Sequence, residues 1–397
     1  MQKRKIAVVT STRADYGILH PLLLQISNDD ALTLELIVTG SHLMQAHGFT
    51  CKEIEKDFST FTKVAMHLEG NSAKANSLAM AQLQKDMTDT LSRLSPDIVV
   101  ILGDRFEILS VALSAMMLRI PLAHIHGGEL TEGAIDDAIR HAITKLSHLH
   151  FASTQEYAQR IIQMGEEPKR VFNVGALGVE NIKKVQLLSK EELEHSLGFR
   201  FLQRNFLVTY HPETLSPLSS KEQVKILLEA LLEFKDVGII FTKSNIDEGA
   251  DAINKALEEY VASHPNTMLI DSLGLVRYLS AIKVVDCVVG NSSSGILEVP
   301  SFQTPTVNIA NRQKGRVAPK SVLHTPLTKK SIIQTLQKAL SKEFIFSIEN
   351  ISNPYEKEGT DKSIKEVLKS VALEEVGVKR FYDMECKKKA LPLNKER

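Results

Sequence analysis

Short apolar runs alternate with amphipathic segments along most of the chain. Runs such as Ile6–Thr10, Leu34–Val38 and Ile120–His126 have the length of strands and are rich in branched apolar side chains. Between them, segments such as residues 18–26 carry apolar residues near the spacing of a helix. Because strands that alternate with helices form a parallel sheet covered by helices, this pattern predicts a doubly wound α/β fold.

The alternation occurs twice, with a more polar stretch between the two sets. The first set ends at the strand Arg170–Val174, and the second begins at the strand Asn205–Tyr210. Residues 176–200 between them are richer in Lys and Glu, as is typical of a junction. Since 397 residues exceed one ordinary core, we expect two Rossmann-like domains, residues 1–180 and 181–365, followed by a C-terminal helix and basic tail at residues 366–397.

Composition narrows the class of protein. Lysine plus arginine and aspartate plus glutamate balance at 48 each, so no net basic field favours nucleic acid. The apolar stretches are strand-sized and shorter than the roughly 20 residues that span a bilayer, and no signal-peptide apolar region precedes the first strand. Three cysteines, Cys51, Cys287 and Cys386, fit neither a disulfide framework nor a zinc-site spacing. We expect a cytoplasmic protein that binds neither nucleic acid nor membrane.

Ionisable residues gather in the stretch Leu102–His141, directly after two apolar runs and at the start of a helix. The carboxyl ends of parallel strands meet at one edge of a sheet, where ligands bind. The stretch therefore predicts a rim with acid–base chemistry. The ionisable residues that the two strand ends and the helix start bring to this rim are Asp104, Arg105, His124, His126, Glu129, Asp136, Asp137, Arg140 and His141.

Each of these residues also has a structural interpretation. Asp104 suits a helix cap as well as a catalytic acid. Acids at a helix start are stabilised by the helix dipole. We therefore favour a structural role over a catalytic one for Asp137, and give the two roles equal weight for Asp136. His124 and His126 could form a metal pair on one strand face. Further ligands at a fixed spacing do not accompany them, so zinc is disfavoured.

A second cluster suits an anion. Gly290–Gly295 reads Gly-Asn-Ser-Ser-Ser-Gly between a predicted strand and helix, where backbone N–H groups converge on a phosphate. It has no Walker lysine, which suits a diphosphate held without Mg²⁺. Three serines between glycines at a strand end favour this anion site over an ordinary capped turn. His211 follows the first strand of the second set, as an acid–base group, a phosphate donor or a plain loop residue. Charge for the anion would come from arginines after the first strand and after the last predicted strand, Thr306–Ile309: Arg13, Arg312 and Arg316.

Together these motifs resemble the hydrolysing UDP-N-acetylglucosamine 2-epimerases of sialic acid and related nonulosonic acid synthesis. The resemblance covers roughly residues 4–340. The shared motifs are Thr12–Tyr16, Gly103–Arg105, His124–Glu129, Ile135–His141, Lys145–His148, His211–Pro212, Asn245–Asp247, Gly290–Gly295 with Glu298, and Arg312–Gln313.

The resemblance implies an architecture and a set of site residues. The two domains would face each other across a cleft, as in GT-B glycosyltransferases, in a homo-oligomer (dimer or tetramer) that needs no metal or cofactor. The catalytic candidates are Asp104, Asp136, His211 and His126, the last standing where the family has the first glutamate of an HxEGGE pattern. Supporting residues would be Arg105, Glu129, Arg140 and His141. The UDP-binding candidates are Arg13, His211, Asn245, Ser292, Ser293, Glu298 and Arg312.

The implied reaction eliminates UDP from a UDP-2-acetamido sugar to give a 2-acetamidoglycal. Hydration of the glycal then gives the free manno-configured sugar for legionaminic or sialic acid synthesis. Because His126 departs from the family glutamate, we favour UDP-N,N′-diacetylbacillosamine over UDP-N-acetylglucosamine as substrate. The alternatives are a non-hydrolysing epimerase, a GT-B glycosyltransferase, a nucleotide-sugar sensor without catalysis, and a zinc hydrolase.

Overall fold

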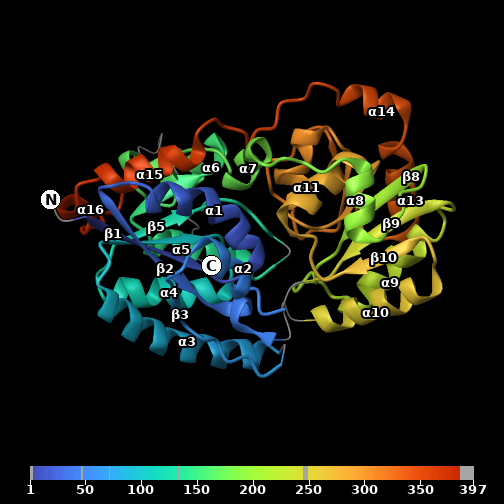
Figure 1. Ribbon diagram of the computed structural model, residues 1–397. Coiled ribbons are helices and arrows are strands. Elements are labelled where there is room, and N and C mark those ends of the chain that lie inside the picture. Colours follow the sequence, from blue (N-terminus) through green and yellow to red (C-terminus); the bar gives the residue numbers. More distant parts are fainter. Residues whose placement is uncertain (1–2, 46–47, 71, 133, 245–248, 385–397) are drawn as a thin grey trace, which may run out of the picture.

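The computed structural model describes residues 3–45, 48–70, 72–132, 134–244 and 249–384, which form two α/β units side by side (Figure 1). The first unit contains a seven-stranded sheet in the order β3-β2-β1-β4-β5-β6-β7. Its strands are parallel and comprise β1 (Arg4–Thr10), β2 (Leu32–Val38), β3 (Thr62–Lys63), β4 (Ile98–Leu102), β5 (Leu122–Ile125), β6 (Leu149–Ala152) and β7 (Val171–Asn173).

The second unit contains a six-stranded parallel sheet in the order β10-β9-β8-β11-β12-β13. Its strands are β8 (Arg204–Thr209), β9 (Val237–Thr242), β10 (Thr267–Ile270), β11 (Cys287–Gly290), β12 (Thr306–Ile309) and β13 (Val322–Thr325). The doubly wound α/β prediction is confirmed. The prediction that Thr306–Ile309 is the last strand is wrong, because the short run Val322–Thr325 adds an edge strand that its sequence pattern does not reveal.

Helices cover both faces of the first sheet, which explains why its strands are apolar on both sides. One face packs against α1 (Arg13–Ser27), α2 (Cys51–Asp57) and α7 (Leu177–Lys184), and the other against α3 (Ala73–Leu94), α4 (Phe106–Met117) and α5 (Asp136–Leu146). Helix α6 (Gln155–Gln163) covers the β6–β7 edge. The helix starts are encoded locally: the Thr12 hydroxyl accepts the Asp15 N–H at the start of α1.

The second sheet is covered in the same way. One face packs against α9 (Ser220–Leu231), α10 (Ala250–Ser263) and α13 (Lys329–Ala339), and the other against α8 (Lys190–Leu197) and α11 (Gly274–Val284). Ser189 and Ser219 start α8 and α9 with capping boxes. The remaining helices of the unit are α12 (Ser294–Leu297) and α14 (Lys342–Ser347).

The chain crosses between the units twice. It leaves the first unit near α7, builds the second, and returns as α15 (Thr360–Ser370) and α16 (Leu373–Val376), which lie along α1 in Figure 1. Ile364, Leu368 and Val376 are buried in the same core cluster as α1. The boundaries at residues 180 and 365 stay predictions, and residues 385–397 of the predicted tail lie outside the described part of the chain.

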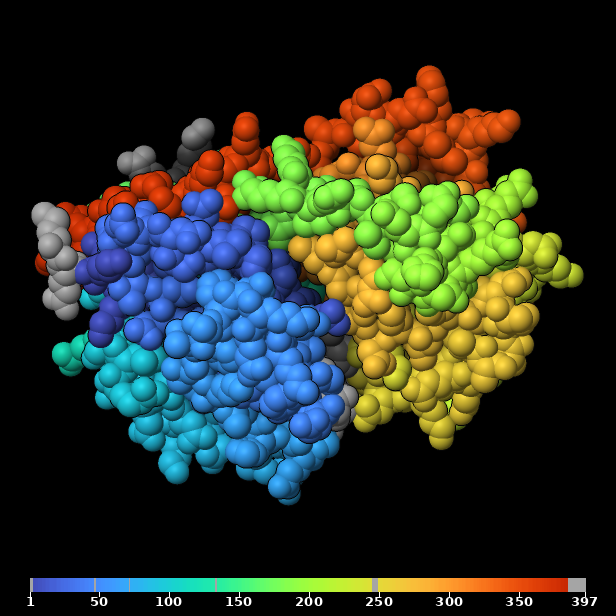
Figure 2. Space-filling view, viewed as in Figure 1, coloured from blue at the N-terminus to red at the C-terminus, as the bar shows by residue number. Residues whose placement is uncertain are grey.

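The space-filling view shows a recess where the two units face each other (Figure 2). The carboxyl ends of the central strands of both sheets carry the predicted site residues toward this interface. In the described part of the chain, no helix is long and apolar enough to cross a membrane.

Candidate active site

The end of β4 supplies Asp104. Gly103 has φ +77°, a left-handed conformation that glycine adopts readily, and it turns the chain into the start of α4. Asp104 is half-buried and its Oδ2 forms an ion pair with Nη2 of Arg140. Next to it, Arg105 Nε donates to Oε1 of the buried Glu107 at 2.6 Å. Asp104 and Arg140 therefore form one ion pair, and Arg105 forms a second with Glu107.

Arg140 ties this group to the loop after β5. Its side chain is buried, Nη2 also donates to Thr131 Oγ1 at 2.6 Å, and Nη1 donates to the Glu129 carbonyl oxygen at 3.0 Å. Burial lowers the pKa of Arg140 from its ordinary value. Because a buried guanidinium is costly without partners, this arginine holds the Asp104 carboxylate and the β5 loop in fixed positions.

His124 has a structural role. Its Nε2 lies 2.7 Å from the Gly103 carbonyl oxygen and its Nδ1 lies 3.3 Å from Thr144 Oγ1. Burial lowers the pKa of His124 to about 3, so the ring is neutral and its Nε2–H donates to the carbonyl. Both nitrogens are engaged, so His124 does not act as a metal ligand here. No group of three or more His, Cys, Asp or Glu within the described ranges could hold a metal ion.

His126 occupies an unusual position directly after β5. It has φ +66° and is 8% exposed, and a non-glycine residue in this region is uncommon. Its Nδ1 lies 3.3 Å from Glu129 Oε1, whereas Nε2 is buried without a hydrogen-bond partner among the described residues. Orphaned buried polar atoms are rare in folded proteins, so Nε2 is a candidate contact for substrate.

Glu129 is buried at the centre of a charged cluster. Its Oε1 accepts the Ser153 hydroxyl at 2.7 Å, and its Oε2 lies 2.7 Å from Arg316 Nη1. Burial alone would raise the pKa of Glu129, but Arg316 and His126 lower it to about 2. The carboxylate is therefore ionised at neutral pH.

Two acids begin α5 and have different surroundings. Asp137 Oδ1 accepts the Thr131 N–H at 2.6 Å, and its Oδ2 lies 3.5 Å from His141 Nε2. Asp137 therefore braces its own loop. Asp136 is half-buried in the first turn of α5. Burial lowers the pKa of His141, although Asp137 opposes this shift.

In the second unit, His211 and the loop after β11 are joined by Asn291. The His211 N–H donates to Asn291 Oδ1 at 2.7 Å, and Asn291 Nδ2 donates to the His211 carbonyl at 2.8 Å. Gly290 has φ +132°, and a Cβ there would lie 1.9 Å from the Thr209 carbonyl oxygen, so only glycine fits. The Asn291 carbonyl accepts Arg312 Nη1 at 3.2 Å. The structure thus brings His211, the serine loop and Arg312 together.

The rest of the predicted UDP-binding set surrounds this loop. Ser292 and Ser293 are half-buried at the start of α12. Glu298 follows α12, burial raises its pKa, and a Cβ on Gly178 of the first unit would lie 2.6 Å from its Oε1. Asn245 lies outside the described residues.

Arginines reach across the interface from both units. A Cβ on Gly274 of α11 would lie 2.9 Å from Nη2 of Arg13, which also pairs with Glu53 Oε1 at 2.8 Å. In the opposite direction, Arg316 Nε donates to the Leu130 carbonyl at 3.1 Å. Each unit therefore places an arginine against the other, and each of these arginines is paired with a carboxylate of the first unit.

Sequence reasoning missed Glu213 and Asn291. Glu213 is buried and accepts the Asn311 N–H at 2.7 Å. Burial raises the pKa of Glu213, and the Asn311 N–H and the charge of Arg312 oppose this shift. Its place two residues after His211 is the only signal in the sequence. Asn291 could have been singled out as the non-serine polar residue inside the glycine-bounded loop.

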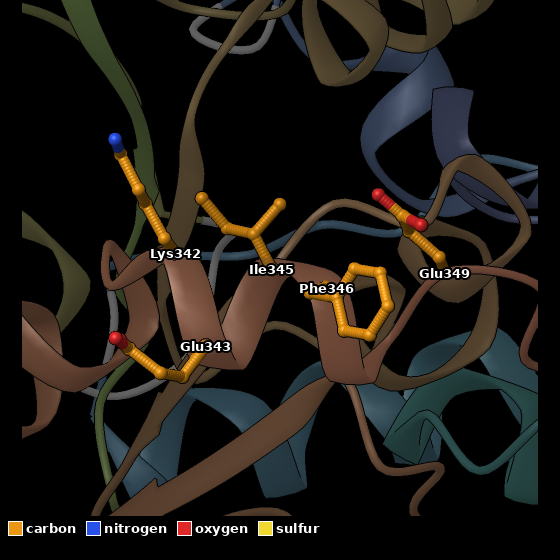
Figure 3. A pocket seen from close by; sticks show the side chains of 5 residues that line it. All are labelled: Lys342, Glu343, Ile345, Phe346 and Glu349. Atoms are coloured by element: carbon orange, nitrogen blue, oxygen red, sulfur yellow. The ribbon is translucent and has the colours of Figure 1, made fainter.

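A shallow depression elsewhere on the surface belongs to neither cluster. It lies over α14, which Figure 1 places at the outer side of the second unit. Figure 3 shows its lining residues, Lys342, Glu343, Ile345, Phe346 and Glu349. It brings no acid–base pair or anion cradle together.

Three comparisons with known proteins bear on this site. The family model for UDP-N-acetylglucosamine 2-epimerase matches residues 24–369. A GDP/UDP-N,N′-diacetylbacillosamine 2-epimerase (hydrolyzing) of Campylobacter jejuni is 42% identical over 97% of this chain and 100% of the relative. The polysialic acid biosynthesis protein P7 of Escherichia coli is 41% identical over 96% of this chain and 98% of its own length.

A further relative and a solved structure agree with these matches. A UDP-N,N′-diacetylbacillosamine 2-epimerase (hydrolyzing) of Legionella pneumophila is 34% identical over 93% of this chain and 97% of its own. The crystal structure of a UDP-GlcNAc 2-epimerase from Neisseria meningitidis bound to UDP-GlcNAc superposes with a TM-score of 0.77. At 19% identity over 92% of this chain and 99% of that one, it shows the shared fold.

Proposed function

The chain belongs to the UDP-N-acetylglucosamine 2-epimerase family, and from this premise we propose that it is a hydrolysing 2-epimerase of a UDP-2-acetamido sugar. The observation that carries the proposal is the opposition of two clusters at one recess. The acid–base rim has Asp104 paired with Arg140, and the glycine- and serine-rich loop has Arg312 behind it. Arg316, which follows β12 in the second unit, pairs with Glu129 of the first rim and so brings the two clusters together.

The chemistry explains why both clusters are needed. The hydrogen at C2 of a 2-acetamido sugar is not acidic, because no carbonyl is attached to C2. It leaves as a proton only when the C1–O bond to UDP breaks and C1 becomes oxocarbenium-like. The C2–H electron pair then forms the C1=C2 bond, and UDP departs with the electron pair of the C1–O bond. Arg13, Arg312 and the N–H groups of the serine loop would stabilise the leaving diphosphate.

Hydration completes the reaction. Water adds to C1 of the 2-acetamidoglycal while a proton returns to C2 from the opposite face, giving the free manno-configured sugar. Two faces of C2 require at least two acid–base groups. We assign these roles to Asp104 and Asp136, with His126 as a third proton carrier and His211 beside the diphosphate.

We favour UDP-N,N′-diacetylbacillosamine as the substrate. Two relatives, from Campylobacter jejuni and Legionella pneumophila, carry this sugar in their names and match nearly the whole chain. The product would feed legionaminic or sialic acid synthesis in the cytoplasm. By resemblance to the family, we also expect the chain to form a homodimer or homotetramer.

Proton NMR in D₂O tests the proposal. The purified protein is given UDP-N,N′-diacetylbacillosamine and, separately, UDP-N-acetylglucosamine. We expect free UDP and a C2-deuterated manno sugar, formed faster from the diacetylbacillosamine donor. A deuterated sugar still attached to UDP would instead establish the non-hydrolysing epimerase, and no reaction despite UDP binding would contradict both enzymes.

A further inference from the structure

We propose that Glu129 is a positioning residue that fixes one tautomer of His126, the one with the proton on Nδ1. Nε2 is then the nitrogen that takes up a proton from the reacting sugar or its attacking water. This role rests on the proposed function. It specifies which nitrogen of His126 carries the proton, and that Glu129 decides this.

The tautomer follows from what Glu129 can accept. Its carboxylate is ionised, as its lowered pKa indicates, so both oxygens accept hydrogen bonds and neither donates. Oε1 lies 3.3 Å from Nδ1 of His126, and a hydrogen bond there requires the proton on Nδ1. In a neutral ring the lone pair then belongs to Nε2, the nitrogen that is buried without a described partner.

The backbone next to His126 is closely packed. A Cβ on Gly127 would lie 3.0 Å from both His124 Nδ1 and Thr144 Oγ1, and a Cβ on Gly128 would lie 2.5 Å from the Tyr157 carbonyl oxygen. The backbone therefore packs tightly against β5, α5 and α6. With φ +66° at His126 itself, this backbone fixes the point from which the His126 side chain extends toward Glu129.

Glu129 is in turn held from the second unit. Arg316 follows β12 and reaches the first unit, where Nη1 lies 2.7 Å from Glu129 Oε2 and Nε donates to the Leu130 carbonyl. Ser153 after β6 donates to Oε1 from the other side. The orientation of His126 thus depends on the second unit being docked against the first, which couples the state of the recess to the readiness of the proton carrier.

The proton transfer balances without an added reactant. In the elimination, the C2–H bond breaks, its electron pair forms the C1=C2 bond as UDP leaves, and the proton joins Nε2. In the hydration, an O–H bond of the attacking water breaks, its electron pair stays on the oxygen that bonds to C1, and the proton joins Nε2. The ring becomes an imidazolium, whose charge Glu129 faces across Nδ1. The proton leaves to solvent or product before the next turnover.

The first test measures the protonation of His126 directly in the wild-type protein. Long-range ¹H–¹⁵N correlation NMR of the full chain, labelled with ¹⁵N-histidine, reports which ring nitrogen carries the proton, and His126→Gln identifies the signals of His126. We expect protonation on Nδ1, in the free protein and with UDP bound. A proton on Nε2 in the neutral ring would overturn the proposal.

The second test compares two ion pairs that cross the same interface. Glu129→Gln lets the amide donate to Nδ1 and permits the other tautomer, so we expect kcat to fall by about 10²–10⁴-fold while KM changes less than about threefold. Glu132→Gln is the matched control, because Glu132 pairs with Lys314 at 2.9 Å on the exposed surface and contacts no histidine in the described part of the chain. Its kcat should stay within about twofold.

The outcomes separate this inference from the proposed function. If Glu129→Gln keeps its kcat, or loses UDP binding together with kcat, Glu129 does not position His126. If the wild-type protein releases no UDP from either UDP-sugar, the proposed function fails. The NMR measurement would still decide whether Glu129 sets the tautomer.

Discussion

The two units use the same sheet order around different chemistry. In each sheet the first strand of the unit pairs with the fourth, and the strand order reverses between them. These strands are β1 and β4 in the first unit, and β8 and β11 in the second. After β4 the chain places Asp104 against a buried arginine. After β11 it places Gly290, Asn291 and serines, with Arg312 behind them.

The backbones at these equivalent ends are alike. Gly103 and Gly290 both have positive φ, and so do His126 and Ala310, which each directly follow the next strand of their sheets. From these ends the chain presents a charged side chain in one unit and backbone N–H groups in the other. The first rim therefore suits proton transfer, which needs acid–base side chains held in place. The second rim suits the binding of an anion, which needs N–H donors.

Among the variants that separate the two rims, Asp104→Asn has the largest expected effect, because it removes the chemistry of the first rim and leaves the second intact. Asp104→Asn keeps the shape of the side chain and removes its basicity, so we expect kcat to fall by about 10³-fold. The dissociation constant for UDP, measured by calorimetry, should change less than about threefold. Asp137→Asn, on the same rim, should keep kcat within about tenfold because Asp137 braces a loop. Equal losses of UDP binding and turnover in Asp104→Asn would assign that acid a structural role.

The converse variant should weaken binding. Arg312→Gln removes a guanidinium that suits phosphate oxygens, and we expect the dissociation constant for UDP to rise about 30–100-fold, or about 2–3 kcal/mol. Lys314→Gln, two residues further on and exposed, should leave it unchanged. An unaltered UDP affinity in Arg312→Gln would show that the second rim does not hold the diphosphate.

The smallest effect concerns acid stability of the first rim. His124 has a folded-state pKa of about 3, below the usual value of 6.5 that the unfolded chain is expected to have. Its contribution to stability is therefore complete above about pH 6.5 and is lost as the pH falls toward 3. Between pH 7 and pH 5, urea unfolding should show that the wild type loses about 2 kcal/mol more than His124→Gln. Equal losses would mean that His124 is protonated in the folded protein.

Much of this arrangement can be predicted from sequence, for a physical reason. An apolar run that ends in Gly103-Asp104-Arg105 or in Gly290–Gly295 predicts a buried strand and the polar side chains at its carboxyl end. Both features can be read from a few consecutive residues. The partners of these residues are not local. Arg316 meets Glu129 and Gly178 meets Glu298 only because the two units dock, and neither pairing has a sequence spacing that reveals it.

The pattern of apolar and polar residues also does not predict the strands β3 and β13. β3 has only two residues, and β13 (Val-Leu-His-Thr) buries only its two end residues. Neither therefore forms the continuous apolar run that marks a buried strand such as β12. His124 illustrates the limit for single residues. Its sequence context fits a metal ligand, whereas its contacts with Gly103 and Thr144 depend on how β4, β5 and α5 pack.

The return of the chain to the first unit has a consequence for how the protein is made. Synthesis begins at the amino end, so the first sheet emerges early, yet Ile364, Leu368 and Val376 of its helical cover emerge almost last. The core clusters of the second sheet are contiguous in sequence, between Leu193 and Ala339 apart from a few flanking residues. On the ribosome, the unit that is translated second can therefore finish folding before the unit that is translated first.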